Sequence, residues 1–244
     1  MWLVLCDPGD RSALWAGQGL RARGLQSLEF VSPMQLVCAP HIEYRAEHGE
    51  PIHAFVTLSS GRRIEVARLS GVLNRATRVD YPQLQHAALT DHPYVQAEMD
   101  AVFLAWLGAL GALATRGAPV FNPAQTSGWA GPLLHPFAWA LHAQRAGFAT
   151  MAHRCGYSGL ELPPHYGPTS TYIVFGKRTF PELPDALTQA ALRLSDSVGV
   201  PLLGITLAWS QDGQASFVNA VATPDLQVGG SAFLDALSAA FNAT

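Results

Sequence analysis

Strand-like apolar runs alternate with segments of helical spacing along the first 150 residues, and this order limits the possible folds more than any other feature. The expected strands lie at 2–6, 28–32, 53–58, 64–69, 71–76 and 118–123, and the expected helices at 11–24, 93–114 and 136–147. The runs at 53–58 and 64–69 flank a Ser-Ser-Gly turn, which predicts a hairpin. Strands that alternate with helices form a parallel sheet covered by helices. We therefore expect a parallel α/β domain over residues 1–150.

The sequence changes in character after residue 150. Proline, glycine and serine are frequent in 157–170, and we interpret residues 151–170 as an irregular linker. Strand-like runs follow at 171–177, 202–209 and 216–221, with helical segments at 184–199 and 231–242. The short turn between the last two strands is typical of antiparallel pairing, so we expect residues 171–244 to form an α+β subdomain.

Composition argues against two classes of partner. The 244-residue chain has 15 Lys and Arg against 18 Asp and Glu, and this net charge of −3 offers no basic surface for nucleic acid or an anionic membrane. No apolar run reaches the roughly 18 residues that a membrane span requires, so we expect the apolar segment 101–114 to be a buried helix. Three widely spaced cysteines fit reduced thiols, which predicts a cytoplasmic protein.

Polar side chains follow the expected strand at 71–76. Asn74, Arg75 and Arg78 would lie beyond the carboxyl end of this strand, where open α/β sheets bind ligands. Arginine can also hold a carboxylate or phosphate through two hydrogen bonds. The alternative for these residues is an ordinary surface salt bridge to Asp80 or Glu98. We therefore treat all three as candidate ligand-binding residues.

Two further residues are candidates for the same site. Asn122 ends the strand at 118–123 and would face the same crevice, although Asn before Pro is also a common turn. Trp129 lies in a glycine-rich loop, where its ring would either stack on a ligand or cover the apolar core. The apolar side of the long helix is expected to be core. Its members are Val102, Leu104, Trp106, Leu107, Leu110 and Leu113.

Histidines and a cysteine gather in the middle of the chain. They are His135, His142, His153, Cys155 and His165. A metal site needs three or four converging ligands, and none of the usual ligand spacings is present. We interpret these residues as scattered, and keep His135, His153 and Cys155 as a weaker alternative for a metal site. Cys155 with His153 as its base is a second weak alternative.

The order of the elements resembles the ATP-grasp superfamily, in particular ligases that modify ribosomal peptides and relatives that add amino acids to carboxylates. Residues 3–24, "LVLCDPGDRSALWAGQGLRARG", match the opening strand and helix of the family's Rossmann-type pre-ATP-grasp domain. "GVLNRAT" (71–77) matches a strand that ends there in Asn-Arg or Arg-Arg, and 98–148 match the long helix, the NP turn and the next helix. From 171 onward the pattern resembles the family's final sheet. The resemblance implies this fold over nearly the whole chain. If part of the helix at 93–114 is exposed, we expect it to serve as the face of a homodimer, as in related ligases.

The sequence departs from this family in the middle of the chain. The family has a lid-bearing lobe after the helix matched by 136–147, and its lysines hold the phosphates of ATP. Here only residues 148–170 separate the helix from the next strand, and they contain no lysine. We expect a linker in place of the lobe, and a C-terminal ATP-grasp sheet that is truncated.

A second departure affects the residues that hold magnesium in the family, "G-x-D" on one strand and "E-x-N" on the next. Thr206 takes the position of the Asp, Asn219 that of the Glu, and Val221 that of the Asn. Magnesium is bound largely by anionic oxygen, and valine cannot bind it at all. We therefore expect a degenerate ATP-grasp protein that has no cofactor and does not use ATP and magnesium.

These observations give one preferred function and two alternatives. The preferred function is a non-catalytic accessory protein that binds a peptide or a partner enzyme in the maturation of a peptide natural product. One alternative is an enzyme with a rebuilt site that uses Arg75, Arg78, His135 or His153. The other is an ATP-dependent carboxylate–amine ligase completed by a partner chain.

The absent lobe also predicts how the C-terminal sheet packs. Its apolar side chains include Ile173, Phe175, Ile205, Leu207 and Phe217, and burying each stabilises the fold by about 1.5–3 kcal/mol. We expect the N-terminal layer to cover them in one compact body. The linker around 161–170 would lie on the surface. Thr206 and Asn219 are expected on neighbouring strands.

Overall fold

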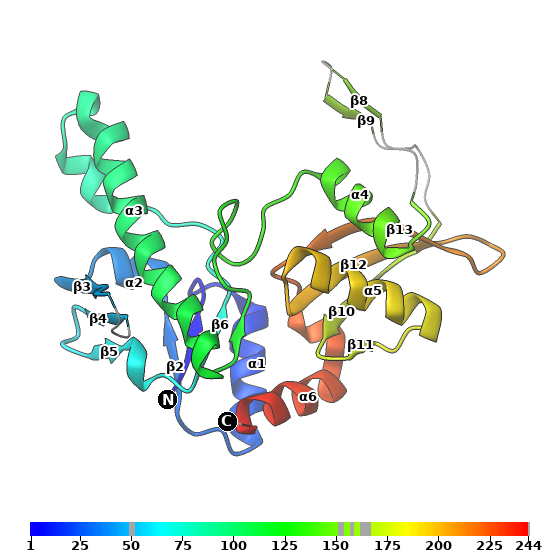
Figure 1. The fold of residues 1–244 in the computed structure, drawn as a ribbon, viewed down its shortest axis with the longest axis horizontal. Helices are drawn as coiled ribbons and strands as arrows, with labels where there is room; N and C mark the ends of the chain where they lie inside the picture. The colour runs from blue at the N-terminus through cyan, green and yellow to red at the C-terminus, as the bar shows by residue number, and fades with distance from the viewer. Residues whose placement is uncertain (49–51, 151–153, 157–158, 162–166, 244) are drawn as a thin grey trace. The chain divides into compact units, whose positions relative to one another are not determined.

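The computed structural model describes residues 1–48, 52–150, 154–156, 159–161 and 167–243. The chain forms two compact units, Met1–Ala130 with Leu237–Thr244, and Gly131–Ala236. Figure 1 shows the elements of both. The division differs from the expected boundary at residue 150, because the helix at 136–146 belongs to the second unit.

The first unit contains a four-stranded parallel sheet with the order β2-β1-β6-β7. Its strands are β1 (Trp2–Leu5), β2 (Leu28–Val31), β6 (Gly71–Asn74) and β7 (Val120–Phe121). The helices are α1 (Arg11–Ala22), α2 (Pro33–Val37) and α3 (His92–Gly111), with 3-10 turns η1 (Val66–Arg68), η2 (Pro82–His86), η3 (Leu89–Asp91) and η4 (Ala112–Arg116). The predicted parallel sheet with intervening helices is thus confirmed.

Two helices of this unit begin at side-chain caps. The Asp10 carboxylate accepts a hydrogen bond from the backbone N–H of Ala13 at the start of α1. Ser32 and Gln35 form a reciprocal capping box at the start of α2. Such caps satisfy backbone donors that have no partner inside the helix. They fix the points at which the chain leaves β1 and β2 and turns into a helix.

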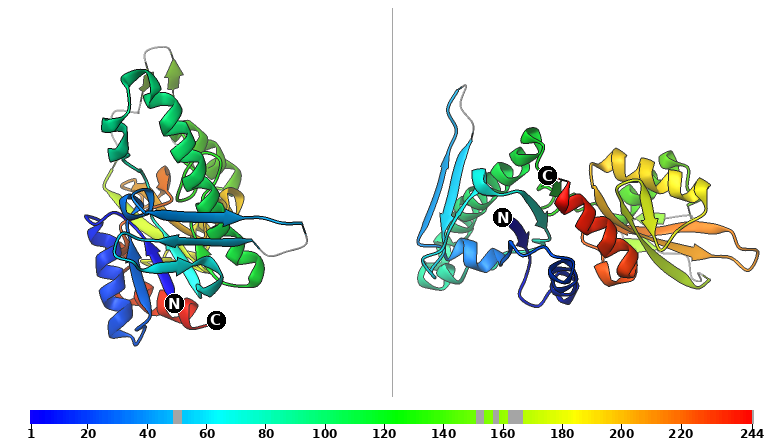
Figure 2. Two further views of the ribbon diagram at one scale, coloured as in Figure 1. Left: turned by 90° about the vertical axis from the view of Figure 1, so that its left-hand side faces the viewer. Right: turned by 90° about the horizontal axis from the view of Figure 1, so that it is seen from below.

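A small antiparallel sheet and α3 cover one face of the parallel sheet, as Figure 2 shows. The small sheet has the order β3-β4-β5, with β3 (His41–Arg45), β4 (His53–Thr57) and β5 (Arg63–Glu65). The pairing of β4 with β5 confirms the predicted hairpin. The sequence analysis missed β3, because four of the five residues in "HIEYR" are polar or aromatic and the run does not look apolar.

The opposite face of the parallel sheet is covered by α1 and by the end of α6 (Gly230–Asn242). Phe241 is buried, with its ring edge-on to Trp2 at 3.8 Å and to Phe121 at 5.6 Å between ring centroids. The last turns of α6 therefore belong to the first unit, whereas the sequence analysis assigned 171–244 to a single C-terminal subdomain.

The second unit is built on an antiparallel sheet with the order β11-β10-β12-β13. Its strands are β10 (Thr169–Phe175), β11 (Arg178–Phe180), β12 (Leu202–Trp209) and β13 (Ala215–Val221). The helices are α4 (Pro136–Ala146), α5 (Asp185–Val198) and the start of α6, which follows the turn η5 (Leu226–Gly229). The predicted antiparallel pairing of the last two strands is confirmed.

Both faces of this sheet are covered within the second unit. On one face Ile205, Leu207 and Phe217 pack against α4 and α5. On the other face Phe233 of α6 lies edge-on to Phe175, at 5.6 Å between ring centroids, and also contacts Phe180. The expectation that the N-terminal layer must cover the sheet is therefore wrong, because α4, α5 and α6 already bury its apolar side chains.

Residues 147–168 connect α4 to β10. The backbone N–H of Phe217 in β13 donates to the carbonyl of Ala149, so the chain beyond α4 first runs along the edge of the sheet. A hairpin of β8 (Arg154–Gly156) and β9 (Gly159–Glu161) follows. Residues 162–166 of the expected surface linker 161–170 lie outside the described residues, and Thr169 and Ser170 already belong to β10.

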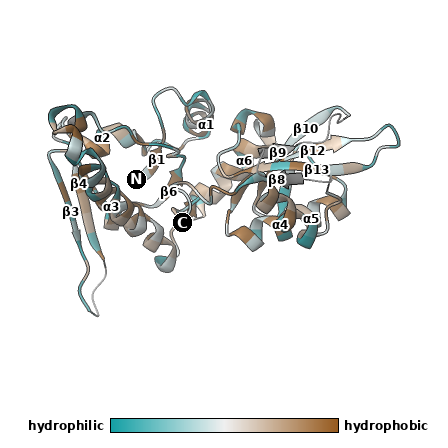
Figure 3. Cartoon of the chain, turned by 90° about the horizontal axis from the view of Figure 1, so that it is seen from above, coloured by the Kyte–Doolittle hydropathy of each residue, from teal (hydrophilic) through white to brown (hydrophobic). Residues whose placement is uncertain are grey.

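The apolar helix α3 is only partly buried. Trp106, Leu107 and Leu110 belong to the core, as does Leu113 of η4. Val102 and Leu104, which were expected in the core, are 50% and 40% exposed. Figure 3 colours α3 by hydropathy. By length and composition Leu89–Arg116 could cross a membrane, a criterion that core helices of soluble proteins also meet.

The position of Phe241 predicts that the end of α6 stabilises the N-terminal sheet. Phe241→Ala should lower the free energy of unfolding by about 3–5 kcal/mol, since it removes a buried ring from between Trp2 and Phe121. Denaturant unfolding followed by tryptophan fluorescence measures this loss. The exposed Ala239→Ser is the control, and an equally small effect of both substitutions would contradict the assignment.

Candidate functional site

Buried polar residues gather where β1, β6 and β7 end. Cys6 follows β1, Asn74 and Arg75 lie at the end of β6, and Asn122 follows β7. All four are buried. Parallel strands end at the same edge of a sheet. The topology therefore brings Asn74, Arg75 and Asn122 together at this edge, as predicted.

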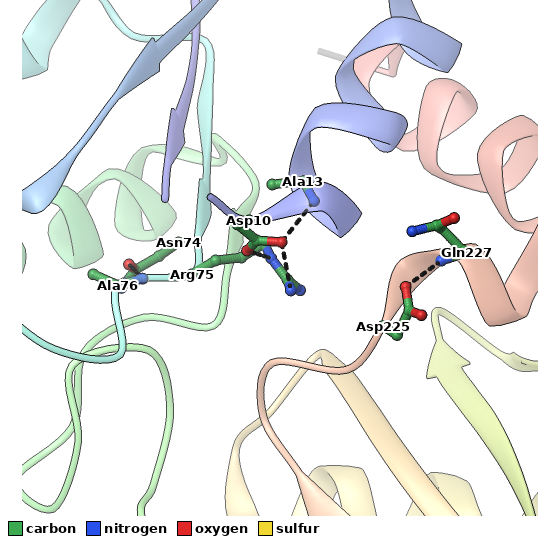
Figure 4. A network of polar contacts seen from close by, with 7 residues as sticks. All are labelled: Asp10, Ala13, Asn74, Arg75, Ala76, Asp225 and Gln227. Carbon is green, nitrogen blue, oxygen red and sulfur yellow. Dashed lines mark hydrogen bonds and ion pairs between the residues drawn. The ribbon is translucent and has the colours of Figure 1, made fainter. Parts of the chain in front are cut away.

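Arg75 is held by an ion pair with Asp10, shown in Figure 4. Its Nε lies 2.7 Å from Oδ2 of Asp10, and its Nη2 lies 3.4 Å from Oδ1. The side chains are 5% and 17% exposed, so the pair is largely shielded from solvent. The same carboxylate caps α1, and the pair therefore joins the end of β6 to the start of that helix. The pair engages the Nε and Nη2 groups of the guanidinium.

Asn74 joins the end of β6 to the loop that follows β7. Its Nδ2 donates to the carbonyl of Trp129 at 2.5 Å, and its Oδ1 accepts from the backbone N–H of Ala76 at 3.1 Å. The Trp129 ring packs edge-on against Phe103 of α3, at 5.3 Å between centroids. The two roles considered for this ring were stacking on a ligand and covering the apolar core. In the structure the ring contacts the core.

Asn122 has a positive φ of 57°, which is uncommon for a residue other than glycine. Asparagine tolerates this left-handed conformation better than most residues. The residue is fully buried at the turn after β7. Both features fit the turn role that the sequence analysis considered for it.

Arg78 lies outside this cluster. It is exposed, and its Nη2 is 3.1 Å from Oδ2 of Asp80. This is the surface salt bridge that the sequence analysis named as its alternative role. The structure therefore brings three of the five candidate residues, Asn74, Arg75 and Asn122, to one edge of the sheet. The carbonyl of Trp129 accepts a hydrogen bond from Asn74. Arg78 lies apart from them.

Cys6 belongs to the cluster although no sequence pattern indicated it. Burial is the main cause that raises the pKa of its thiol from 9.0 to about 12, with the charge of Asp10 adding to the rise and Arg75 opposing it. A thiol in this state is a poor nucleophile at neutral pH. The cluster thus contains an arginine that is ion-paired with a carboxylate, a protonated thiol and two buried side-chain amides. Such a set positions backbone and loop, and its two charged side chains, Asp10 and Arg75, are paired with each other.

A second polar group lies on the sheet of the second unit. Thr171, Thr206 and Asn219 occupy directly paired positions on β10, β12 and β13. The hydroxyl oxygens of Thr171 and Thr206 are 3.2 Å apart and share a hydrogen bond. The predicted placement of Thr206 and Asn219 on neighbouring strands is confirmed. We call Thr171, Thr206 and Asn219 the neutral row.

Val221 lies two positions along β13 from Asn219 and is 42% exposed. It pairs with Gly204, whose missing side chain makes room for Pro224, because a Cβ there would lie 2.6 Å from the proline Cβ. The sheet therefore carries hydroxyl, amide and alkyl groups at the three positions where the resemblance implies metal ligands.

The histidines that were considered for a metal site do not form one in the described part of the chain. Nδ1 of His135 accepts a hydrogen bond from the backbone N–H of Phe137, so this residue caps α4. His153 and the side chain of Cys155 lie outside the described residues. No group of three His, Cys, Asp or Glu residues within the described ranges is arranged to hold a metal.

The fold is that of solved ATP-grasp ligases. The ligase PsnB, complexed with a phosphomimetic variant of a minimal precursor, Mg and ADP, matches with a TM-score of 0.69 and 15% identity, over 99% of this chain and 97% of that one. The macrocyclase MdnC from Microcystis aeruginosa MRC, bound with the precursor peptide MdnA, matches with a TM-score of 0.68 and 8% identity, over 92% of both chains.

A third structure is similar over most of its length. A RiPP-associated ATP-grasp ligase from Chryseobacterium gregarium, in complex with ADP and a leader and core peptide, matches with a TM-score of 0.62 and 10% identity, over 97% of this chain and 96% of that one. The sequence matches no family model and no curated protein. The chain therefore has an ATP-grasp-like fold of mixed helices and sheets, as the resemblance implied.

The Asp10–Arg75 pair predicts strong coupling between two residues far apart in sequence. Arg75→Met should lower the free energy of unfolding by about 3–5 kcal/mol, because it leaves the Asp10 carboxylate without its cation in a shielded site. Adding Asp10→Asn, which keeps a capping side chain, should recover part of this loss. A double-mutant cycle by denaturant unfolding measures the coupling.

Arg78→Gln is the matched control, since its salt bridge is exposed and worth about 0–1 kcal/mol. Additive effects of Arg75→Met and Asp10→Asn would contradict the proposed pairing.

The raised pKa of Cys6 predicts a dependence of stability on pH. In the unfolded chain the thiol ionises near its usual pKa of 9.0, whereas in the folded chain it stays protonated until about pH 12. Its contribution is fully present below pH 9, and the free energy of unfolding should fall as the pH rises from 9 towards 12. Cys6→Ala should remove this part of the slope, whereas Cys38→Ala, at an exposed position, should keep it. Equal slopes in the wild type and Cys6→Ala would contradict the assignment.

Proposed function

We propose that this chain is a non-catalytic ATP-grasp-like protein that binds a peptide or a partner enzyme during the maturation of a ribosomal peptide. The observation that carries the proposal is the neutral row Thr171, Thr206 and Asn219 on the C-terminal sheet. The function follows from what this row can and cannot bind.

The neutral row lacks the charge that a magnesium–triphosphate complex needs. Magnesium is typically held by one or two carboxylates together with substrate phosphates, and phosphoryl transfer depends mostly on positioning and neutralisation of charge. A hydroxyl pair and an amide offer dipoles in place of carboxylates. The hydroxyl oxygen of Thr206 also lies 3.2 Å from that of Thr171, and the two hydroxyl groups form a hydrogen bond. We infer that the chain does not use ATP and magnesium.

The solved neighbours support the choice of a peptide as partner. PsnB, MdnC and the Chryseobacterium gregarium ligase were each solved with a precursor, leader or core peptide bound. A chain that keeps this fold without the charged metal positions could still hold such a peptide. It would then present the peptide to a separate catalytic partner. The exposed Val102 and Leu104 of α3 support a further part of the proposal, a homodimer through this helix.

Isothermal titration with ATP and magnesium tests the proposal on the unmodified protein. We expect no heat of binding at micromolar to millimolar nucleotide, with an active ATP-grasp ligase as the positive control. Clear micromolar binding of ATP would refute the non-catalytic assignment.

Restoring the two carboxylates provides a sharper test of the neutral row. Thr206→Asp with Asn219→Glu places two carboxylates on directly paired positions of β12 and β13. We expect this variant to gain binding of Mn²⁺, used as a probe for Mg²⁺, while the unmodified protein binds none at the same concentration. Electron paramagnetic resonance of free Mn²⁺ measures the difference. Thr206→Val with Asn219→Leu is the matched uncharged control, and equal Mn²⁺ binding by the wild type would contradict the account.

A further inference from the structure

A pocket with both aliphatic and polar lining residues lies in the first unit, between the start of β4 and the end of α3. It has a volume of about 230 Å³ and is lined by the aliphatic side chains of Ile52, Val66, Ala109, Ala112 and Leu113. Val66, Ala109 and Leu113 are buried members of the core of this unit, and Ile52 and Ala112 are half-buried. The pocket is much larger than the roughly 30 Å³ that one water molecule occupies in the liquid.

The pocket adjoins a larger hollow with which it shares Ile52 and Arg116. This hollow has a volume of about 640 Å³ and is also lined by Glu43, Arg45, Glu47 and His53. Small-molecule sites have volumes in this range and combine apolar walls with a few polar groups that fix the ligand's orientation. Both cavities are formed entirely by residues of the first unit.

The charged groups of the hollow differ in their partners. Arg45 is paired with Glu47 at 2.5 Å. Glu43 lies between two histidines, with Oε2 at 3.5 Å from Nε2 of His41 and Oε1 at 3.7 Å from Nδ1 of His53. The side chain of Arg116 forms no hydrogen bond or ion pair with any residue that the structure describes. It stands at the end of η4, where Gly117 stops the helix with a φ of 82°. Its guanidinium is therefore the group of the hollow that is open to a ligand.

We infer that this pocket binds a carboxylate that carries a short aliphatic group. The carboxylate would accept two hydrogen bonds from the guanidinium of Arg116, the geometry in which arginine binds such groups best. The aliphatic part would fill the space between Ile52, Val66 and Leu113. Glu43 would face a neighbouring N–H or ammonium group of the ligand. The C-terminal residue of a peptide and a free aliphatic amino acid both have this chemistry.

This site is independent of the function proposed above. It uses none of the residues of the neutral row, and it lies in the first unit, whereas the neutral row belongs to the second. An ATP-dependent ligase could possess it as well. If this binding site is disproved, the proposed function is unaffected. If the proposed function is disproved, this binding site is unaffected.

Nuclear magnetic resonance titration of the full chain tests the inference. The probes are a neutral hexapeptide ending in valine with a free carboxylate, the same peptide amidated, and free L-valine. We expect the acid peptide or free valine to shift the amide signals of Thr115 and Arg116, and the amidated peptide to bind at least about tenfold more weakly. Binding of the acid peptide without free valine identifies a peptide terminus, and the reverse pattern identifies an amino acid.

Variants separate the two parts of the pocket. Arg116→Gln should weaken binding at least about tenfold, and it should fold normally because Arg116 is exposed. Ala112→Leu should weaken binding by filling the apolar part. Arg145→Gln, which removes an exposed arginine of α4, should leave binding unchanged. The inference is overturned if no probe binds at millimolar concentration, or if the amidated peptide binds as tightly as the acid.

Discussion

The ion pair between Asp10 and Arg75 fixes the carboxyl edge of the N-terminal sheet. Asp10 has two tasks there, since its carboxylate caps α1 through Ala13 and neutralises the buried guanidinium of Arg75. Asn74, the neighbour of Arg75, holds the Trp129 loop through its side-chain amide. The start of α1, the end of β6 and the loop after β7 thus depend on two adjacent residues. In this protein the edge where an open α/β sheet usually binds a ligand is occupied by its own side chains.

Much of the fold could be predicted because its strands and helices have clear periodicity. The pairing of β12 with β13 followed from two apolar runs around a short turn, and the parallel sheet followed from alternation. The strand β3 was missed because its sequence is polar, and it exists because β4 pairs with it. Val102 and Leu104 were misplaced because α3 is apolar on nearly every side, so that its sequence cannot indicate which side faces the core.

The candidate site could be predicted only in part. The residues at the ends of β6 and β7 were found because topology brings strand ends together. The partner of Arg75 was not found, because Asp10 lies on a different element and nothing in the local sequence connects the two. Cys6 was missed for the same reason. The helices that cover the C-terminal sheet were also not predicted. We had assigned α4 to the N-terminal domain, and we had treated residues 171–244, which include α6, as one subdomain.

Two features of the chain lead to opposite expectations about its chemistry. The fold is that of ligases solved with nucleotide and precursor peptide, whereas the row across β10, β12 and β13 is uncharged. A fold does not determine function, and the chemistry of the site decides. The most direct measurement is ADP formation by the purified protein at high enzyme concentration, with ATP, magnesium and candidate precursor peptides. The account predicts no ADP above the level of a Thr206→Val, Asn219→Leu control. Peptide-dependent ADP formation that this control lacks would contradict it.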